Sequence, residues 1–539
     1  MQGSDVLCLE ELSHTSFLAT SNVIADEREA TGGTGSAEVE DRYEDGEQSV
    51  SVTDGARSLR QVIDLLGAST ESFSAAQLAT TVLGITVESS KVSNGFIFVA
   101  LPGEHTHGAH FVPDALSRGA IALITDEEGE RISGLQIPMV KIKKVREMVG
   151  ALSSFVYGDP STSMQVVAVT GTNGKTTVTS LLEYFWNRSG ISAGVIGTLG
   201  ARFYTEGKLV SLPSARTTPE SCELQAELAL MRDAGVKAVA MEVSSHALSL
   251  HRVDGIHFKL ALFTNLSQDH LDFHHTMEEY FLAKSKLFTS IFSECALINV
   301  DDSYGKRLFA DCEISSVSIS SAVGDWQLSL SNLELTSPSG KRHIFESPLV
   351  GDFNQMNAAM ALVAFAQTGG NIDEGIELLR SFPGVPGRLE RVGNGAPLIL
   401  VDYAHTPDAV TRVLASLRSH TSGRIIAVLG CGGDRDPLKR PEMGRALQEG
   451  ADIAIATSDN PRSEDPAAIL AAMCGENFNG SQILDRREAI SYAISQATDV
   501  DLVLIAGKGH EQGQEVDGVI TPFDDREVAL EILAKRGRS

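Results

Sequence analysis

The segment AVTGTNGKTTVTS, residues 168–180, constrains the fold of this chain more than any other stretch. It overlaps the end of a short apolar, β-branched run at residues 166–169, which predicts a buried strand. It leads into a stretch with Val178, Leu181 and Phe185 at helical spacing. A strand, a glycine-containing loop and a helix in this order direct several backbone N–H groups and a helix N-terminus at one anion. The segment therefore predicts a phosphate-binding loop in an α/β fold.

This loop matches the P-loop pattern G-x-x-x-x-G-K-[ST] only in part. Gly174, Lys175 and Thr176 fit, but Val169 occupies the place of the first glycine and Gly171 lies closer. The chemistry of the pattern assigns Lys175 to the terminal phosphates, and the hydroxyl of Thr176 or of the next threonine to Mg²⁺. The alternative is a glycine-rich turn that binds nothing. Because few such turns also carry GKTT at the start of a helix, we expect a nucleotide site.

Net charge and cysteine usage exclude several classes of partner. The chain has 539 residues, with 44 Lys and Arg against 71 Asp and Glu, so its formal charge is −27. Affinity for nucleic acids and anionic membranes rests on Lys and Arg, so neither is expected as a partner. The six cysteines form no C-x-x-C pair, no apolar run is long enough to span a membrane, and no basic region leads into an apolar core at the N-terminus. We expect a cytoplasmic protein with reduced thiols and no membrane insertion.

The chain is too long for one hydrophobic core, and its composition changes along its length. The N-terminal stretch ends in TGGTGSAEVEDRYEDGEQ, which is Gly-rich, acidic and typical of disorder. Beyond it, apolar strands alternate with helical stretches, which predicts largely parallel sheets. Breaks at YGDP and PGVPGRLE divide this part. We predict a disordered acidic extension at 1–57, a small α/β domain at 58–158, a central P-loop domain at 159–390 and a C-terminal Rossmann-like domain at 391–539.

Polar side chains gather where the predicted strands of the central domain end, which is where ligands bind in open α/β sheets. The strand at 238–245 carries Glu242, an acid placed to complete a Mg²⁺ site beside the P-loop threonine. The strand at 260–270 ends in Asp269 and His270, and His270 is the candidate ligand of a second metal ion. Two alternatives for the histidines that follow are solvated residues at a helix start and a zinc site, which lacks a distant Cys/His pattern.

The C-terminal domain carries two loop arginines, Arg435 in GGDRD and Arg462 in SDNPR. Guanidinium groups bind carboxylates bidentately, which lysine does not imitate. With Asp459, Asn460 and Glu511, these arginines suit a ligand that bears both carboxylate and amino groups. Ordinary surface salt bridges are the alternative, and composition does not decide between the two. The residues thus predict an ATP-using enzyme without naming its reaction.

The chain resembles the Mur ligases over about residues 58–530, with the N-terminal extension left out. The resemblance rests on motifs that occur in the family's order: GTNGKTT (171–177), TTPE (217–220), MEVSSHAL (241–248), NLSQDHLDFH (265–274), YFLAK (280–284), FNQMNAA (353–359), PGRLE (386–390), VDYAHTPD (401–408), GCGGDRD (430–436), SDNPR (458–462) and AGKGHE (506–511).

The resemblance implies an ATP-dependent ligase that works through an acyl phosphate in peptidoglycan precursor synthesis. A carboxylate of UDP-N-acetylmuramoyl-L-alanyl-D-glutamate would attack the γ-phosphate of ATP, and the amine of meso-diaminopimelate would then displace phosphate. ATP and Mg²⁺ are the implied cofactors. We expect a monomer whose domains close around these substrates. Two alternatives remain: a folylpolyglutamate synthase, which would not explain SDNPR with GGDRD, and a P-loop nucleotide switch that performs no ligation.

The resemblance also implies roles for the matching residues. The implied catalytic residues are Lys175, His270 and Lys284. The implied metal ligands are Thr176, Glu242, His270 and Lys284, the last carbamylated as in the family's YxxAK motif. The implied ATP contacts are Gly171, Thr172, Asn173, Gly174, Lys175, Thr176, Thr177, Asn357, Arg388 and Asp402. The implied contacts of the UDP-sugar peptide are Ser89, Thr217, Thr218, Ser244 and Arg252. The implied diaminopimelate contacts are Arg435, Asp459, Asn460, Pro461, Arg462, Gly507 and Glu511.

Arg462 is expected to select the amine. The distal end of diaminopimelate bears a carboxylate and an ammonium, whereas lysine lacks that carboxylate and would leave the arginine unpaired. For Lys284, the alternative is a solvated helix lysine, which the sequence alone would favour. Three positions depart from the family pattern and bear on the nucleotide sugar: ESS (88–90) in place of D-S-R, HG (107–108) in place of D-G, and Leu250 where some members have a polar residue.

Overall fold

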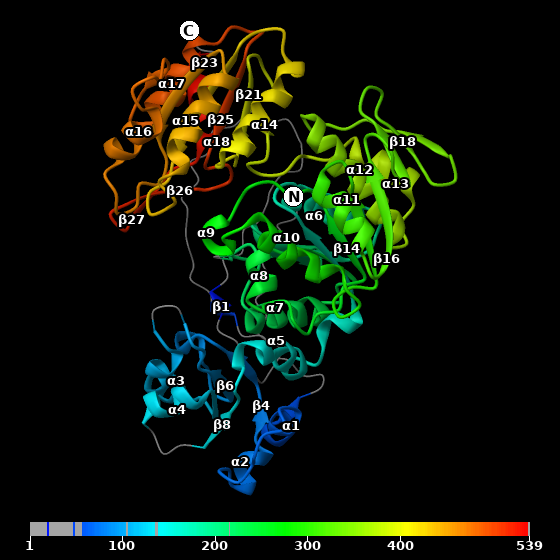
Figure 1. The fold of residues 1–539 in the computed structure, drawn as a ribbon, viewed down its shortest axis with the longest axis vertical. Helices are drawn as coiled ribbons and strands as arrows, with labels where there is room; N and C mark the ends of the chain where they lie inside the picture. The colour runs from blue at the N-terminus through cyan, green and yellow to red at the C-terminus, as the bar shows by residue number, and fades with distance from the viewer. Residues whose placement is uncertain are drawn as a thin grey trace, which may run out of the picture.

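The structure is a computed structural model that describes residues 19–20, 47–48, 56–103, 106–134, 138–214 and 216–536. The acidic extension predicted at 1–57 therefore lies almost wholly outside the described residues, apart from residues 56–57 and the short antiparallel pair β1 (Ala19–Thr20) and β2 (Glu47–Gln48). The rest forms three α/β units, coloured blue to cyan, green, and yellow to red along the chain in Figure 1. The predicted α/β class with three domains is confirmed.

The first unit is built on a four-stranded parallel sheet, in the order β5-β6-β7-β8. Phe96 and Phe98 of β6 pack into one core cluster and Ile97 and Val99 into another, so both faces of the sheet are covered. Its strands are β3 (Arg57–Ser58), β4 (Thr81–Val82), β5 (Gly84–Thr86), β6 (Phe96–Val99), β7 (Ala122–Thr125) and β8 (Met139–Lys141). Its helices are α1 (Leu59–Leu65), α2 (Ala75–Ala79), α3 (Val112–Ser117), α4 (Glu127–Ser133) and α5 (Val145–Val156).

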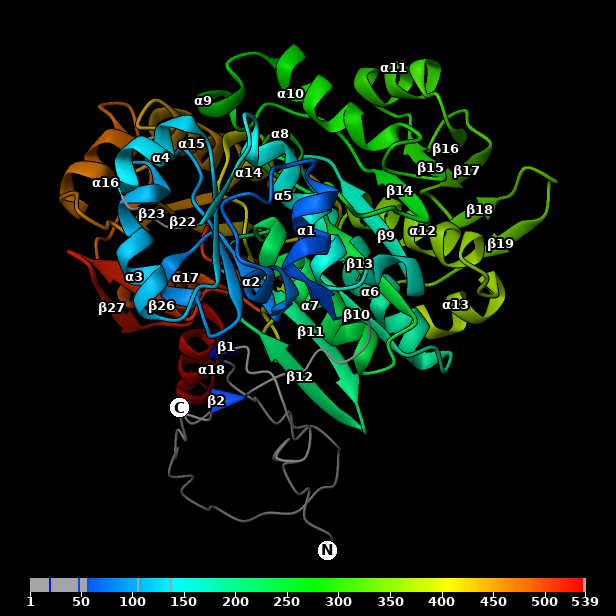
Figure 2. The same cartoon turned by 90° about the horizontal axis from the view of Figure 1, so that it is seen from below.

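The central unit contains an eleven-stranded sheet in the order β12-β11-β10-β13-β9-β14-β15-β16-β17-β18-β19. Figure 2 shows β12 and β19 at the two ends of this sheet. In the order of the sheet, the seven strands β10, β13, β9, β14, β15, β16 and β17 run parallel. Antiparallel strands that were not predicted, β11 and β12 at one end and β18 and β19 at the other, extend the sheet. The strands are β9 (Gln165–Thr170), β10 (Ala193–Gly197), β11 (Gly200–Thr205), β12 (Lys208–Leu212), β13 (Ala238–Glu242), β14 (Leu260–Phe263), β15 (Cys295–Asn299), β16 (Ser315–Ser320), β17 (Trp326–Ser329), β18 (Glu334–Thr336) and β19 (Arg342–Ile344).

Helices cover both faces of this sheet. Val167 and Val169 of β9 pack in the same core cluster as α6, α12 and α13, whereas Val166 and Ala168 pack with α7, α8 and α10. This alternation explains why β9 reads as a continuous apolar run. The helices are α6 (Lys175–Arg188), α7 (Ser221–Asp233), α8 (Ser245–Ser249), α9 (Leu271–His274), α10 (Met277–Ser285), α11 (Ser303–Asp311), α12 (Asp352–Gln367) and α13 (Ile372–Leu379).

The C-terminal unit has a six-stranded sheet in the order β20-β21-β25-β22-β23-β24, parallel except for β20. The predicted boundary after residue 390 falls within β20. The strands are β20 (Glu390–Arg391), β21 (Leu398–Asp402), β22 (Ile425–Cys431), β23 (Ile453–Ser458), β24 (Ser481–Gln482), β25 (Leu502–Ala506) and the hairpin β26 (Gly513–Val516) and β27 (Val519–Pro522). The helices are α14 (Pro407–Leu417), α15 (Lys439–Gly450), α16 (Pro466–Cys474), α17 (Arg486–Gln496) and α18 (Asp525–Arg536).

The parallel strands bring the polar loops together, because their carboxyl ends meet at one edge of each sheet. In the central sheet β9 lies between β13 and β14, so the P-loop stands between the loops that follow Glu242 and Phe263. In the C-terminal sheet the loops after β21, β25, β22 and β23 adjoin in the same way. Among the described residues, no helix is both long and apolar enough to cross a membrane.

Candidate active site

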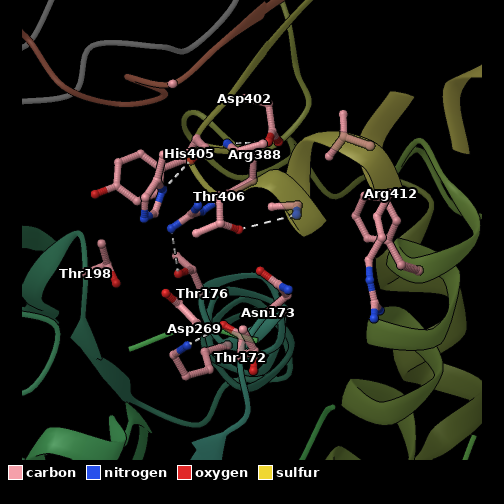
Figure 3. A pocket seen from close by; sticks show the side chains of 18 of the residues that line it. Thr172, Asn173, Thr176, Thr198, Asp269, Arg388, Asp402, His405, Thr406 and Arg412 are labelled. Carbon is pink, nitrogen blue, oxygen red and sulfur yellow. Dashed lines mark hydrogen bonds between the residues drawn. The ribbon is translucent and has the colours of Figure 1, made fainter. Parts of the chain in front are cut away.

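A cavity of about 830 Å³ lies where the strand ends of the central and C-terminal sheets face each other. Figure 3 looks into it, with Thr172 and Thr176 of the P-loop on one side and Arg388 and Asp402 on the other. The residues of the predicted sites that line it are Thr172, Asn173, Gly174, Lys175, Thr176, Thr177, Thr217, Glu242, His270, Asn357, Arg388, Asp402, Arg435, Asp459, Asn460, Arg462, Gly507 and Glu511. The candidate nucleotide loop and the candidate amino-acid pocket therefore open into one space.

The P-loop is held in a conformation that requires glycine at two positions. Gly171 has φ +143° and Gly174 has φ +88°, both in the region that favours glycine. A Cβ atom on Gly171 would lie 1.9 Å from Thr264 Oγ1, and one on Gly174 would lie 2.4 Å from Asn357 Oδ1. The Asn173 N–H donates to Asn265 Oδ1 at 3.1 Å. The loop after β14 and helix α12 thus press on the P-loop from two sides.

Two lysines converge on one carbonyl of the P-loop. Lys175 Nζ donates to Gly171 O at 3.0 Å and to Thr172 O at 2.9 Å. Lys284 Nζ donates to the same Gly171 O at 2.9 Å and to Thr170 Oγ1 at 3.3 Å. Burial, with a contribution from the charge of Lys175, lowers the pKa of Lys284 well below its usual range. Because Lys284 is only 1% exposed, the alternative of a solvated helix lysine is wrong: α10 points this side chain under the P-loop.

The candidate metal ligands belong to different elements around the P-loop. Glu242 is buried at the end of β13, where its carboxylate accepts from the Thr198 N–H at 2.9 Å and the Thr198 hydroxyl at 3.1 Å. Thr176 Oγ1 accepts from Arg388 Nη2 at 3.4 Å. No group of three or more His, Cys, Asp or Glu side chains is arranged for a metal ion within the described residues. One hydroxyl and one carboxylate beside a phosphate loop suit Mg²⁺ better than zinc. Mg²⁺ keeps waters and phosphate oxygens as further ligands, whereas zinc takes three or four protein ligands.

The histidines after β14 differ in their surroundings. His270 lies at the start of α9 with φ +53°, its Nε2 is 3.4 Å from Asp269 Oδ2, and burial lowers its pKa to about 4. A neutral imidazole is the form that binds metals. His274 is buried against Ser245 Oγ at 2.8 Å, so the alternative of a solvated side chain is wrong for this residue. His275 is exposed, as that alternative expects.

The two residues assigned to adenosine have protein hydrogen-bond partners, whereas one buried N–H of the γ-phosphate residue has none among the described residues. Asn357 Nδ2 donates to Asn354 Oδ1 at 3.1 Å. Both carboxylate oxygens of Asp402 accept backbone N–H groups at 2.8 Å, and burial raises its pKa. The guanidinium of Arg388 stacks 4.4 Å from the centre of the Tyr403 ring, and its buried Nε has no protein partner. An unpartnered buried N–H beside the P-loop is suited to an anionic oxygen.

The C-terminal pocket combines side chains of three loops. Arg462 has φ +52°, and its Nη1 donates to Gly433 O at 2.7 Å while its Nε lies 3.4 Å from Glu515 Oε2. Arg435 is exposed at the edge of the cavity. Asn460 Nδ2 donates to Glu511 Oε2 at 2.7 Å, which links the loops after β23 and β25. Pro461 is buried and does not line the cavity.

Three family models match consecutive parts of the chain. The Mur ligase family catalytic domain matches residues 81–157, the Mur ligase middle domain matches 169–365, and the Mur ligase glutamate ligase domain matches 387–509. The chain is 44% identical to the UDP-N-acetylmuramoyl-L-alanyl-D-glutamate--2,6-diaminopimelate ligase of Streptomyces coelicolor, over 89% of this chain and 97% of the relative. The chain belongs to the Mur ligase family.

Other similar proteins carry the same description or share the fold. The Corynebacterium glutamicum protein of the same description is 42% identical over 83% of this chain and 91% of its own. A solved diaminopimelate ligase is 32% identical, with a TM-score of 0.62, over 90% of this chain and all of its own. The MurF ligase of Thermotoga maritima, solved with ADP, shares the fold at 18% identity and a TM-score of 0.58, over 85% and 98% of the two chains.

In this Mur ligase, the residues assigned to the UDP-sugar peptide lie mostly beside the P-loop. Thr218 donates to Glu242 O at 2.9 Å and accepts the Ser244 N–H at 3.1 Å. Arg252 Nη2 lies 2.9 Å from Glu220 Oε1. Thr217 lines the cavity, whereas Thr218, Ser244 and Arg252 do not. Ser89 lies apart in the first unit, where it begins a 3₁₀ turn at Ser89–Lys91.

The structure explains some of the departures from the family pattern and leaves one unexplained. His107 accepts the Ala109 N–H on Nδ1 at 3.0 Å, and its Nε2 lies 3.1 Å from Asp126 Oδ1. It therefore caps the short helical turn that follows it, as an aspartate would. In the ESS segment, Glu88 pairs with Lys91 at 3.1 Å, and Lys91 also contacts Glu223 of α7 in the central unit. Nothing in the structure explains Leu250.

Sequence reasoning missed several polar residues of the site. Thr198 orients Glu242, and Tyr403 stacks on Arg388. Lys439 Nζ lies 3.5 Å from Asp269 Oδ1, which joins the C-terminal unit to the loop of His270. Neither Thr198 nor Lys439 stands in a recognised motif, so no sequence signal marked them. Lys508 lies inside AGKGHE, but the resemblance assigned ligand contacts in this motif only to Gly507 and Glu511.

Replacing Gly174 with alanine is expected to weaken ATP binding by at least about tenfold, because Cβ would strain a left-handed backbone and contact Asn357. Gly190, beyond the other end of α6, has φ +81° and open space around its Cβ position. Gly190→Ala is the matched control, with similar backbone strain and unchanged ATP affinity. Calorimetric titration with ATP compares the two variants, and equal losses of affinity would contradict the steric argument.

Proposed function

We propose that this Mur ligase joins the free carboxylate of UDP-N-acetylmuramoyl-L-alanyl-D-glutamate to an amino group of meso-diaminopimelate at the expense of ATP. One observation supports this above all: the P-loop and the loops that carry Arg435 and Arg462 line the same cavity. An activated acyl group formed at the P-loop would be within reach of an amino acid held by these loops. Relatives at 42–44% identity are named for the same reaction.

The chemistry requires two displacements. A carboxylate oxygen of the acid attacks the γ-phosphorus of ATP, ADP leaves, and an acyl phosphate forms. The amine nitrogen then attacks the acyl carbon, loses a proton, and expels phosphate to leave an amide. Phosphorylation is needed because the oxygen of a free carboxylate is a poor leaving group. The protein supplies positioning and positive charge, for which Lys175, the P-loop N–H groups and Arg388 are placed.

Thr176 and Glu242, with His270 and a carbamylated Lys284, are the residues that would hold Mg²⁺. Bound Mg²⁺ would neutralise charge on the phosphate oxygens. The low pKa of Lys284 favours its neutral amine, the form that adds CO₂. Carbamylation would place an anion beside the Lys175 ammonium, and so give an attraction between opposite charges at this buried position.

We further propose that the enzyme acts as a monomer in the cytoplasm. The described cysteines, Cys222, Cys295, Cys312, Cys431 and Cys474, are all free thiols, which suits a reducing compartment.

The test is to mix purified protein with ATP, Mg²⁺ and the UDP-dipeptide, and to add diaminopimelate, lysine or no amine. We expect amide formation and phosphate release that depend on both the UDP-dipeptide and diaminopimelate. Phosphate release that ignores both acceptors would contradict the proposal and favour a nucleotide switch. Turnover with a folate and glutamate would favour the folylpolyglutamate synthase alternative. The Mycobacterium tuberculosis enzyme of that description shares only the fold with this chain, at 20% identity and a TM-score of 0.54, over 67% of this chain and 92% of its own.

A further inference from the structure

Lys508, two residues beyond β25, is a fully buried cation to which neither the family resemblance nor the proposed reaction assigns a role. Its side chain has no exposed area. Lysine is rarely buried in this way, because removing its charge from water is strongly unfavourable unless partners replace the solvent. The contacts of Lys508 therefore reveal what the fold uses this charge for.

The ammonium group of Lys508 connects three polar side chains of the amino-acid pocket. It donates to Asn460 Oδ1 at 2.9 Å and to Glu511 Oε2 at 3.4 Å, and it lies 3.7 Å from Asp459 Oδ1. Asn460 Nδ2 closes the network by donating to Glu511 Oε2 at 2.7 Å. These partners come from two loops, one after β23 and one after β25. A single buried cation thus links both loops.

The position of Lys508 is behind the wall of the cavity rather than in it. Asp459, Asn460 and Glu511 line the cavity, whereas Lys508 does not. The glycine before it, Gly507, has φ +111°, and a Cβ atom there would lie 2.6 Å from Asp459 Oδ2. Glycine at position 507 therefore lets the backbone before Lys508 approach the loop of Asp459 closely. The Lys508 ammonium contacts the pocket side chains from the side that faces away from the cavity.

We propose that Lys508 is the positioning residue of the amine pocket: it holds Asp459 and Glu511 in place as a pair of carboxylates that receive an ammonium group of the amino-acid substrate. Without the buried cation, the two carboxylates would repel each other and Asn460 would lose a partner. With it, the cluster of two carboxylates and one ammonium keeps one net negative charge, which a substrate ammonium neutralises. This inference rests on the proposed function.

Structural support of the same loops comes from a different residue. The guanidinium of Arg486 is also fully buried, pairs with Asp525 at 2.6 Å, and donates to Ser458 O and Ala506 O at the ends of β23 and β25. Arg486 therefore holds the strand ends, whereas Lys508 contacts pocket side chains. This division gives the experiment a scaffold comparator in the same unit.

The experiment measures steady-state kinetics of the full-length chain with Lys508→Met. We expect the KM for diaminopimelate to rise about tenfold, as for loss of one charged hydrogen-bond partner. The kcat at saturation and the KM values for ATP and the UDP-dipeptide should change by less than about threefold. Arg486→Lys, the comparator, is expected to lower the melting temperature without this selective rise. Lys508→Gln, which keeps a donor but loses the charge, gives the same comparison if Lys508→Met does not fold.

A double-mutant cycle with Glu511→Gln tests whether Lys508 acts through its partner. The effect of the double variant on the KM for diaminopimelate should be clearly smaller than the product of the two single effects. Multiplicative effects, an unchanged KM for diaminopimelate, equal rises of all three KM values, or the same selective rise in Arg486→Lys would each overturn the inference. A wild-type protein that does not use diaminopimelate would instead overturn the proposed function.

Discussion

Replacing Lys284 with alanine is expected to lower turnover by about a thousandfold, the upper range for losing one preorganised charged group at a reaction centre. The side chain is 1% exposed and contacts Thr170 Oγ1 and Gly171 O beneath the P-loop. Alanine removes either the ammonium or the carbamate from this place and leaves both polar atoms without their lysine partner. Steady-state turnover with ATP, the UDP-dipeptide and diaminopimelate measures the loss. Lys286→Ala is the matched control, because Lys286 is exposed two residues further on and should tolerate the change.

Chemical rescue distinguishes the two possible charges of Lys284. If the functional group is a carbamate, formate or acetate should restore part of the activity of Lys284→Ala, whereas methylamine should not. Wild-type protein in ¹³C-bicarbonate should also give a carbamate resonance that is absent from Lys284→Ala, and this readout does not depend on activity. Rescue by methylamine alone would contradict the carbamate and indicate that an ammonium acts here.

Replacing Arg462 with alanine is expected to lower kcat/KM for diaminopimelate by about 10- to 150-fold, since hydrogen bonds to a charged group contribute about 1.5–3 kcal/mol. In the structure its guanidinium is fixed by Gly433 O and neutralised in part by Glu515, and a quarter of the side chain remains exposed toward solvent. A substrate carboxylate would compete with Glu515 for this cation. Because the arginine also disfavours amines without that carboxylate, its removal should narrow the preference for diaminopimelate over lysine.

The measurement compares kcat/KM for diaminopimelate and for lysine, together with the KM for ATP, in Arg462→Ala and in Arg445→Ala. Arg445 is an exposed arginine of α15 outside the cavity lining and serves as the control. We expect the KM for ATP to stay near that of the wild type in both variants. An equal loss of ATP and diaminopimelate affinity in Arg462→Ala would contradict its assignment to the amine pocket.

Much of the fold could be predicted because its signals are local. Short stretches of sequence predict the strand before the P-loop, the helix after it and the apolar strands of both large sheets. The antiparallel strands that extend the central sheet were missed, because β11, β12, β18 and β19 are only partly buried and lack the continuous apolar pattern of the parallel strands.

Residue types and their spacing in short motifs predicted which chemistry the chain carries. The GKTT loop at a strand end and the acid at Glu242 indicate a nucleotide site through residue type and spacing, whereas the arginines of GGDRD and SDNPR were assigned a ligand only by the resemblance to the Mur ligases. The packing of the three units shows which of these groups line the same cavity, and which residues outside the predicted sites contact them. Lys284 lies under a loop more than a hundred positions earlier, Lys439 reaches Asp269 across two units, and Lys508 is buried behind carboxylates from two loops. Burial and charge pairing depend on how separate elements pack. A local sequence pattern therefore does not show which residue from a distant part of the chain becomes a neighbour.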